Sequence, residues 1–323
     1  METQQLPSDA CPLIFIPYSL FPIPYSLFPI PYSLFPVLRS SLLAAMAPAG
    51  ENAWVQQISF RMRPRVPFGA YATGTTDKEA PMHSVWFGEF MGTLVLILLG
   101  NGVNAGVTLR KSYAADSGWI VITTGWALGV LCGVIVAQAF GSPGANLNPA
   151  ITLASAVVSG NYAPVFSMWS AQLLGAFCGA SLVALHYGPH WALTPDPAAK
   201  LGVFSTNAAV RSPLLNIFSE MIGTAVLVLV ANAIFSKGVA LNGPAAGVGP
   251  WLVGSLVWGI GLSLGGTTGY AINPARDLGP RIAHWLLPIP GKGSSNWRYA
   301  PIPIIGDLIG GALAGLLVRC AHL

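Results

Sequence analysis

The sequence predicts an all-α membrane protein in which six transmembrane helices and two re-entrant half-helices form two inverted three-helix repeats. Three observations carry this prediction: the apolar composition, the long apolar segments and a short motif that occurs once in each half. Hydrophobic residues make up 53% of the 323 residues and charged residues only 8%, whereas soluble domains carry about 25% charged residues. With a mean hydropathy of +0.62, this composition is typical of an integral membrane protein.

Residues 1–81 precede the long apolar segments and contain a tandem repeat. Residues 16–36 are three copies of Ile-Pro-Tyr-Ser-Leu-Phe-Pro, and the recurrent prolines prevent a continuous helix, so this stretch is not a membrane span. A secretory signal would need an unbroken apolar core. One interpretation is a disordered, proline-rich extension. We favour another: the unit ATTCCCT, repeated in tandem, translates as this heptapeptide, so residues 1–81 would be mostly translated non-coding DNA and the working protein would start near Met82.

Residues 82–321 are predicted to form one membrane domain, because six apolar segments there are long enough to cross a bilayer core, which takes about 20 residues of helix. Two shorter apolar stretches, 149–158 and 274–286, cannot cross alone. A short helix at membrane depth is tolerated only where protein buries it or where it lines a cavity, so both are predicted to be half-helices. The predicted spans are residues 84–106, 118–140, 163–186, 213–235, 247–265 and 301–320.

The two halves of this domain repeat each other. The motif Glu-x-x-Gly-Thr begins at Glu89 in the first span and at Glu220 in the fourth. The first repeat covers about residues 84–187 and the second about residues 213–320. Because each repeat has an odd number of spans, the second enters the membrane from the opposite side, and the half-helices approach the midplane from opposite faces. Inverted repeats with broken helices that meet at the midplane are typical of a transport pathway.

The tripeptide Asn-Pro-Ala stands at the start of each half-helix. Asn is a favoured N-cap, and Pro suits the first helical position because its missing N–H would have no partner there. Two such helix starts facing each other place two positive dipole ends and two amide donors at one point. A permeating hydroxyl would turn its oxygen toward them, and a cation would meet an electrostatic barrier. The residues are Asn148, Pro149, Ala150, Asn273, Pro274 and Ala275.

The paired Asn-Pro-Ala motifs, the Glu-x-x-Gly-Thr openings and Arg276 together resemble the major intrinsic proteins, the family of aquaporins and glycerol facilitators. The resemblance covers about residues 84–321. It implies a six-span right-handed bundle in the cell membrane, a pore in each protomer, a homotetramer and cytoplasmic termini. The Lys and Arg residues that follow residue 82 favour the opposite orientation by the positive-inside rule; we follow the family. It also implies a passive channel for a small neutral solute, not an enzyme, with no cofactor.

The resemblance also implies a selectivity constriction. Arg276 is a charge within a membrane segment, which is costly and functional by default. Water-selective members place a His at the position of Gly261, where Gly leaves room. Trp126 and Tyr270 can form an aromatic corner for a carbon backbone while Arg276 and nearby carbonyls satisfy hydroxyls, which fits a polyol. Glycerol is therefore the favoured solute, with water, urea and other polyols as further candidates. The constriction residues are Trp126, Gly261, Tyr270 and Arg276.

Further residues have expected supporting roles. Carbonyls of the loops before the half-helices are expected to line the pore, and Glu89 and Glu220 to accept hydrogen bonds from the N–H groups of these loops. Asp307 stands where the family commonly has Pro; it either faces Gln172 or is peculiar to this chain. The expected carbonyls belong to Gly144, Ala145, Asn146, Gly269, Tyr270 and Ala271. Four residues resemble the glycerol-conducting branch: Asp277, Arg281, Pro303 and Ile304.

Other functions have less support. A water-selective channel is the first alternative, and a secondary transporter with inverted repeats the second; a transporter needs further intramembrane carboxylates for its coupling ion. An enzyme would need a nucleophile and base or a metal, but the five histidines are dispersed and no Cys/His spacing resembles a metal site. The formal net charge of +4 is small and scattered, which argues against nucleic acid as a partner. The expected partners are a small neutral solute and the lipid bilayer.

Overall fold

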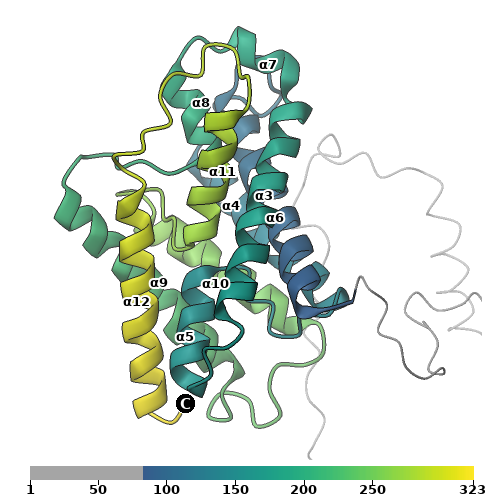
Figure 1. Ribbon diagram of the computed structural model, residues 1–323, viewed down its shortest axis with the longest axis vertical. Helices are drawn as coiled ribbons and strands as arrows, with labels where there is room; N and C mark the ends of the chain where they lie inside the picture. Colours follow the sequence, from purple (N-terminus) through teal and green to yellow (C-terminus); the bar gives the residue numbers. More distant parts are fainter. Residues whose placement is uncertain (1–82) are drawn as a thin grey trace, which may run out of the picture. The chain divides into compact units, whose positions relative to one another are not determined.

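The computed structural model describes residues 83–323, so the predicted extension at residues 1–81 lies outside the described residues. The described part is built of helices (Figure 1), and all of them except two short helices between the halves lie close to predicted positions. The first half contains α3 (Val85–Thr108), α4 (Trp119–Ala139), α5 (Pro149–Ser159) and α6 (Val165–His186). The second half contains α9 (Pro213–Phe235), α10 (Val248–Leu264), α11 (Pro274–Leu286) and α12 (Pro301–Cys320). Two short helices, α7 (Gly188–Leu193) and α8 (Pro197–Phe204), lie between the halves.

The lengths of the helices separate spans from half-helices. Five helices, α3, α4, α6, α9 and α12, are long and apolar enough to cross a membrane. The sixth predicted span is α10, which has 17 residues. At a rise of 1.5 Å per residue it is about 25 Å long, a little less than a hydrocarbon core of about 30 Å. With 11 residues in α5 and 13 in α11, neither of these helices can cross alone.

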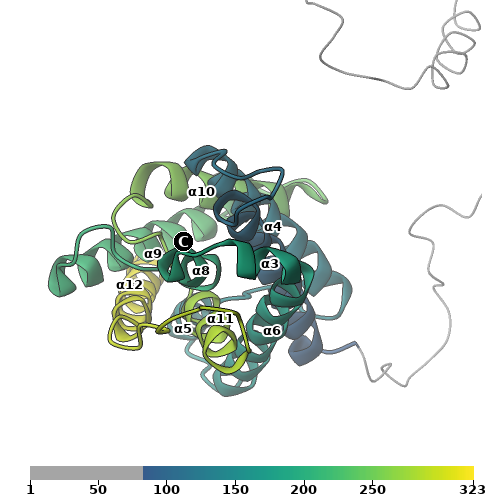
Figure 2. The same cartoon turned by 90° about the horizontal axis from the view of Figure 1, so that it is seen from above.

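The two halves pack by the same scheme and exchange their half-helices. α3 packs against α4 and α6, and α9 packs against α10 and α12. Half-helix α5 packs mainly against α12 of the other half, and α11 packs mainly against α6. The side view shows α11 and α5 end to end, and the view from above shows them superposed (Figures 1 and 2). Each half-helix is thus held at its depth by a full-length span of the opposite repeat.

Two glycines show that the helix pairs of the two halves are equivalent. A Cβ at Gly175 of α6 would collide with the carbonyl oxygen of Phe90 on α3. A Cβ at Gly310 of α12 would collide with the carbonyl oxygen of Met221 on α9. Phe90 and Met221 occupy the same position in the repeated Glu-x-x-Gly-Thr motif. Close approach of helix backbones through small residues is the usual way in which membrane helices pack.

Each half-helix begins at the Pro of an Asn-Pro-Ala motif, with the Asn as its N-cap. Asn148 Oδ1 accepts a hydrogen bond from the N–H of Ala150 at 2.8 Å. Asn273 Oδ1 accepts one from the N–H of Ala275 at 3.0 Å. The side-chain oxygens therefore satisfy helix N–H groups that have no intrahelical partner. The side-chain nitrogens are left free to donate elsewhere.

Candidate functional site

A cavity of about 420 Å³ lies against the N-terminal ends of both half-helices. Side chains of α4, α5, α9 and α10 make a largely apolar wall, and the loops before α5 and α11 add polar groups. An apolar cavity with a few placed polar groups is typical of a site for a small molecule. Of the residues that the sequence singled out, the structure places Trp126, Gly144, Ala145, Asn146, Asn148, Tyr270, Ala271, Asn273 and Arg276 on this wall.

The two motif asparagines join the loops of the two halves. Asn148 Nδ2 donates a hydrogen bond to the carbonyl oxygen of Ile272 at 2.7 Å. Asn273 Nδ2 donates one to the carbonyl oxygen of Leu147 at 2.9 Å. A side-chain amide carries two N–H donors, and both asparagines line the cavity. The second N–H of each amide is therefore available to a solute at the point where the half-helices meet.

The backbone of the two loops is strained in the same pattern. Four non-glycine residues have left-handed conformations: Ala145 with a φ of 42°, Leu147 with 54°, Tyr270 with 39° and Ile272 with 43°. This conformation costs an L-residue about 1–2 kcal/mol. Such residues persist only where the surrounding structure over-determines them. Here the surrounding structure includes a buried glutamate in each half.

Glu89 holds the first loop. Its Oε1 accepts hydrogen bonds from the Ser142 hydroxyl at 2.6 Å and from the N–H of Asn146 at 2.9 Å. Its Oε2 accepts from the N–H of Leu147 at 2.7 Å and from the side-chain amide of Gln172 at 2.8 Å. Because Glu89 is fully buried, these donors replace the water that a carboxylate would otherwise require.

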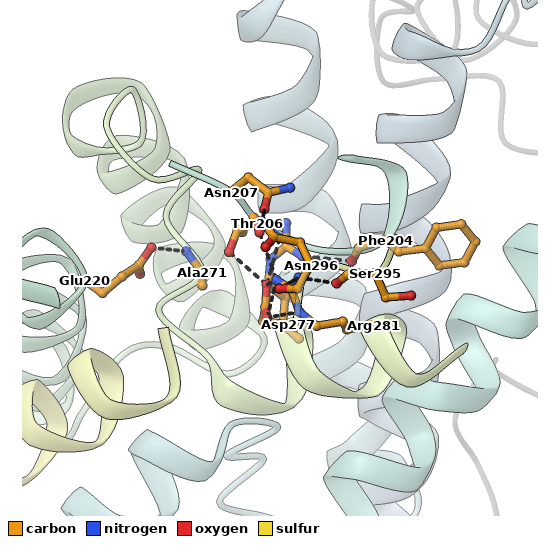
Figure 3. A network of polar contacts seen from close by, with 10 residues as sticks. Phe204, Thr206, Asn207, Glu220, Ala271, Asp277, Arg281, Ser295 and Asn296 are labelled. Atoms are coloured by element: carbon orange, nitrogen blue, oxygen red, sulfur yellow. Dashed lines mark hydrogen bonds and ion pairs between the residues drawn. The ribbon is translucent and has the colours of Figure 1, made fainter. Parts of the chain in front are cut away.

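Glu220 holds the second loop in the same manner. Its Oε1 accepts a hydrogen bond from the N–H of Ala271 at 3.1 Å, and its Oε2 accepts one from the N–H of Ile272 at 3.0 Å. Figure 3 shows the Glu220 side chain pointing from its helix toward Ala271. Both glutamates thus bind the two N–H groups at equivalent positions of their loops.

Asp307 lies beside Glu220, and Gln172 lies beside Glu89. Gln172 donates to Glu89 and also to the Thr152 hydroxyl at 2.8 Å. Asp307 accepts a hydrogen bond from the Thr224 hydroxyl at 3.2 Å. No hydrogen bond joins Asp307 to Gln172 within the described residues, and whether they face each other across the two halves stays a prediction. The two residues occupy equivalent places in opposite halves.

Arg276 and Trp126 meet on the cavity wall. The guanidinium carbon of Arg276 lies 4.0 Å from the centroid of the Trp126 ring, and a cation over a desolvated ring gains about 2 kcal/mol. Arg276 Nη1 donates to the carbonyl oxygen of Phe204 at 3.3 Å, and Trp126 Nε1 donates to Asn104 Oδ1 at 3.0 Å. Both side chains are therefore fixed by neighbours. Since arginine has five N–H donors, others are available to a solute.

The Tyr270 ring, also on the cavity wall, fits against α10 because Gly261 has no side chain. A Cβ at Gly261 would lie 2.8 Å from Cζ of the Tyr270 ring and 3.0 Å from Cγ2 of Thr123. The carbonyl oxygen of Gly261 accepts a hydrogen bond from Trp119 Nε1 at 3.0 Å, and the Trp119 and Tyr270 rings meet edge to face at 5.7 Å. Gly261 is thus behind Tyr270 and is not part of the wall.

A buried ion pair fixes the loops around Arg276 (Figure 3). Arg281 Nη2 lies 2.8 Å from Asp277 Oδ2, one turn away on α11. Asp277 Oδ1 accepts from the N–H and the hydroxyl of Thr206, at 2.7 and 2.8 Å. Arg281 Nη1 donates to the carbonyl oxygens of Ser295 and Asn296, at 2.8 and 3.2 Å. The pair therefore ties the segments after α8 and before α12 to α11.

The other residues expected at the site lie off the cavity wall: Glu89, Pro149, Ala150, Glu220, Gly261, Gly269, Pro274, Ala275, Asp277, Arg281, Pro303 and Ile304. Pro303 and Ile304 are in the first turn of α12. Conversely, the sequence did not indicate Leu147 and Ile272, whose carbonyl oxygens hold the motif asparagines. Each directly precedes a motif Asn, a signal that could have identified them. Among the described residues no group of three or more His, Cys, Asp or Glu could hold a metal ion.

Comparisons with known proteins agree with this arrangement. The chain is 52% identical over 243 residues to the glycerol uptake facilitator protein of Bacillus subtilis, covering 74% of this chain and 85% of that protein. It is 52% identical over 235 residues to a probable glycerol uptake facilitator protein of Thermotoga maritima, covering 72% and 97%. The X-ray structure of the aquaglyceroporin from Plasmodium falciparum superposes with a TM-score of 0.63 at 26% identity, covering 72% of this chain and 94% of that one.

The same family is found along nearly the whole described chain. The family model described as major intrinsic protein matches residues 78–318. This range includes every helix from α3 to α11 and most of α12. The chain belongs to the major intrinsic protein family and is a multi-pass, all-helical membrane protein.

Proposed function

We propose that this protein is a passive channel whose principal solute is glycerol, with water, urea and other small polyols as further solutes, and that it excludes ions and protons. The observation that carries the proposal is the part of the cavity wall formed by Trp126, Tyr270 and Arg276. It combines two aromatic side chains with a multiple hydrogen-bond donor. A glycerol molecule has the same two sides, a carbon backbone and a row of hydroxyl groups.

At this constriction the solute exchanges its water shell for protein groups. The carbon backbone lies against Trp126 and Tyr270, and Arg276 donates to the hydroxyl oxygens. The hydroxyl hydrogens are donated to the carbonyl oxygens of the loop that contains Tyr270 and Ala271. Gly261 gives Tyr270 the space to stand back from the path, so that a molecule wider than water can pass.

The N-terminal ends of α5 and α11, where the two half-helices meet, determine which species the channel excludes. The second N–H groups of Asn148 and Asn273 and the positive ends of two helix dipoles face the same point. A water or glycerol oxygen accepts from these donors, which turns its hydrogens away and interrupts a chain of donating waters. A cation at this point meets a positive potential on both sides, and Arg276 adds a further positive charge. Cations and protons are therefore excluded.

The remaining expectations are part of the same proposal. Glu89 and Glu220 support the loops, and Asp277 and Arg281 support the outer segments near Arg276. The channel domain extends over residues 82–321, both termini face the cytoplasm, and the protein assembles as a homotetramer with one pore in each protomer. The family relationship supports all of these points.

Stopped-flow light scattering on proteoliposomes tests the solute. Vesicles placed in a glycerol gradient should shrink and then reswell rapidly, and control vesicles without protein should reswell slowly. A gradient of an impermeant sugar measures water flux alone. Fast water flux without glycerol flux would show a water-selective channel. A glycerol flux that saturates and depends on an ion gradient would show a transporter.

A further inference from the structure

Asp307 occupies the place in the second half that Gln172 occupies in the first. Gln172 stands three residues before Gly175 and Asp307 three residues before Gly310. These glycines touch the residues that directly follow Glu89 and Glu220. In the first half the amide of Gln172 donates to Glu89 Oε2 at 2.8 Å. A carboxylate at the equivalent position has no hydrogen to donate unless it is protonated.

The surroundings of Asp307 are those of a protonated acid. Its side chain is fully buried, and its Oδ1 accepts from the Thr224 hydroxyl at 3.2 Å. Its Oδ2 is buried and receives no donor within the described chain. The helices of Asp307 and Glu220 touch at this point, because a Cβ at Gly306, next to Asp307, would lie 2.8 Å from the Cβ of Glu220. Two ionised carboxylates in contact and shielded from water repel strongly, so such a pair shares a proton.

The neighbours of the pair decide which carboxyl carries the proton. Glu220 accepts two backbone N–H bonds, from Ala271 and Ile272, and such bonds favour the ionised form. Asp307 accepts only the bond from Thr224 within the described chain. A proton held by the two carboxyl groups therefore has its place on Asp307.

The charges near Asp307 favour the same assignment. The titratable groups that act on Asp307 are Glu220 of α9, Asp277 of α11 and Tyr299 of the segment before α12. Half-helix α5 also packs on α12 but contains no charged residue. The two nearby arginines have other partners, since Arg281 pairs with Asp277 and Arg276 lies over the Trp126 ring. An ionised Asp307 would add a negative charge beside Glu220 in the protein interior, which is costly.

We propose that Asp307 is a proton-bearing positioning residue: it donates a hydrogen bond to Glu220, and so holds the loop of Tyr270, Ala271 and Ile272 as Gln172 holds the loop of the first half. Loss of this proton places two negative charges side by side behind the loop. The loop then loosens, and Tyr270 and Ala271 leave the positions that they have on the cavity wall. The effect on flux rests on the proposed function, whereas the protonation of Asp307 does not.

Infrared spectroscopy of the full chain in lipid vesicles tests the protonation directly. The wild-type protein should show the C=O stretching band of a protonated carboxyl group at neutral pH. This band should be lost in Asp307→Asn and kept in Asp116→Asn, which changes an exposed aspartate. Absence of the band from the wild type, or its survival in Asp307→Asn, would overturn the proposal. If Asp307→Asn does not fold, Asp307→Gln takes its place in the test, because it introduces the same side chain as Gln172.

Glycerol flux measured against pH tests the positioning role. Flux through the wild type should fall as the pH is raised, in step with the disappearance of the infrared band. Flux through Asp307→Asn should be independent of pH, because its neutral amide donates at every pH. Equal pH dependence in both proteins would show that Asp307 does not act through its proton. If the infrared band is present in the wild type and lost in Asp307→Asn, but no glycerol flux is measured, the proposed function is contradicted and the assignment of the proton stands.

Discussion

Gly261 leaves the space that the Tyr270 ring fills. A methyl group at this position would lie 2.8 Å from the ring, so Gly261→Ala should push Tyr270 into the cavity. We expect glycerol flux to fall about tenfold, the change that a barrier increase of about 1.4 kcal/mol produces, and water flux to fall less. Stopped-flow light scattering with glycerol and with an impermeant sugar measures both fluxes. Gly261→His should narrow the path further.

The same helix offers a matched control for this substitution. Gly259 is two residues away on α10, and a Cβ there would have no neighbour within 4 Å. Gly259→Ala should therefore leave both fluxes unchanged. If Gly261→Ala and Gly259→Ala behave alike, the contact between Gly261 and Tyr270 does not set the width of the path.

The chemistry of single residues could be predicted in part. Asn148, Asn273 and Arg276 carry polar groups inside apolar segments, so the sequence itself marks them. Leu147 and Ile272 act through backbone carbonyls held in a left-handed conformation. That conformation is rare for bulky residues, and their side chains carry no mark of it. Residue type predicts side-chain chemistry better than it predicts the direction of a carbonyl group.

Half-helix α11 is fastened to its surroundings by the buried pair of Asp277 and Arg281. Asp277→Asn would leave the buried Arg281 without its counter-charge, and breaking a buried ion pair on one side costs about 3–5 kcal/mol. Because Asn keeps part of the hydrogen bonding, we expect a loss of about 3 kcal/mol in the free energy of unfolding. Denaturant unfolding in detergent, followed by circular dichroism, measures this loss.

The exposed residue Asp116 provides the comparison for this element. Asp116→Asn makes the same chemical change on the surface, where substitutions usually stay within about 0.5 kcal/mol. A similar small effect of Asp277→Asn would mean that Arg281 keeps enough partners among Thr206, Ser295 and Asn296 without its carboxylate. The segments after α8 and before α12 would then not depend on the ion pair.

Element positions were predictable because each element has a local signal. Long apolar runs mark the spans, and Asn followed by Pro marks the start of each half-helix. The residues that each element contacts were harder to predict from the sequence. The carbonyl of Phe204 and the side chain of Asn104 reach Arg276 and Trp126 from other helices. No local pattern reports such contacts, since they depend on how α8 and α3 pack.

For the whole membrane domain, the inverted repeat explains how one path is built from two similar halves. Each half supplies a strained loop, a glutamate that holds it and an N-cap asparagine that reaches the loop of the other half. The halves differ where the site needs asymmetry. Arg276 of the second half lies over Trp126 of the first on the cavity wall, and the second half has Asp307 at the place of Gln172.

All of these groups lie at residue 84 or later, and the family match begins at residue 78. A chain that starts at Met82 should therefore insert, fold and conduct glycerol at the rate of the full-length chain. Parallel stopped-flow measurements on both chains at equal protein density in vesicles make the comparison. A lower flux, or failure of the shorter chain to insert, would show that residues 1–81 contribute to the channel.

Mass spectrometry of the natively produced protein adds a second test, because a peptide from residues 16–36 would contradict the interpretation of that repeat as translated non-coding DNA.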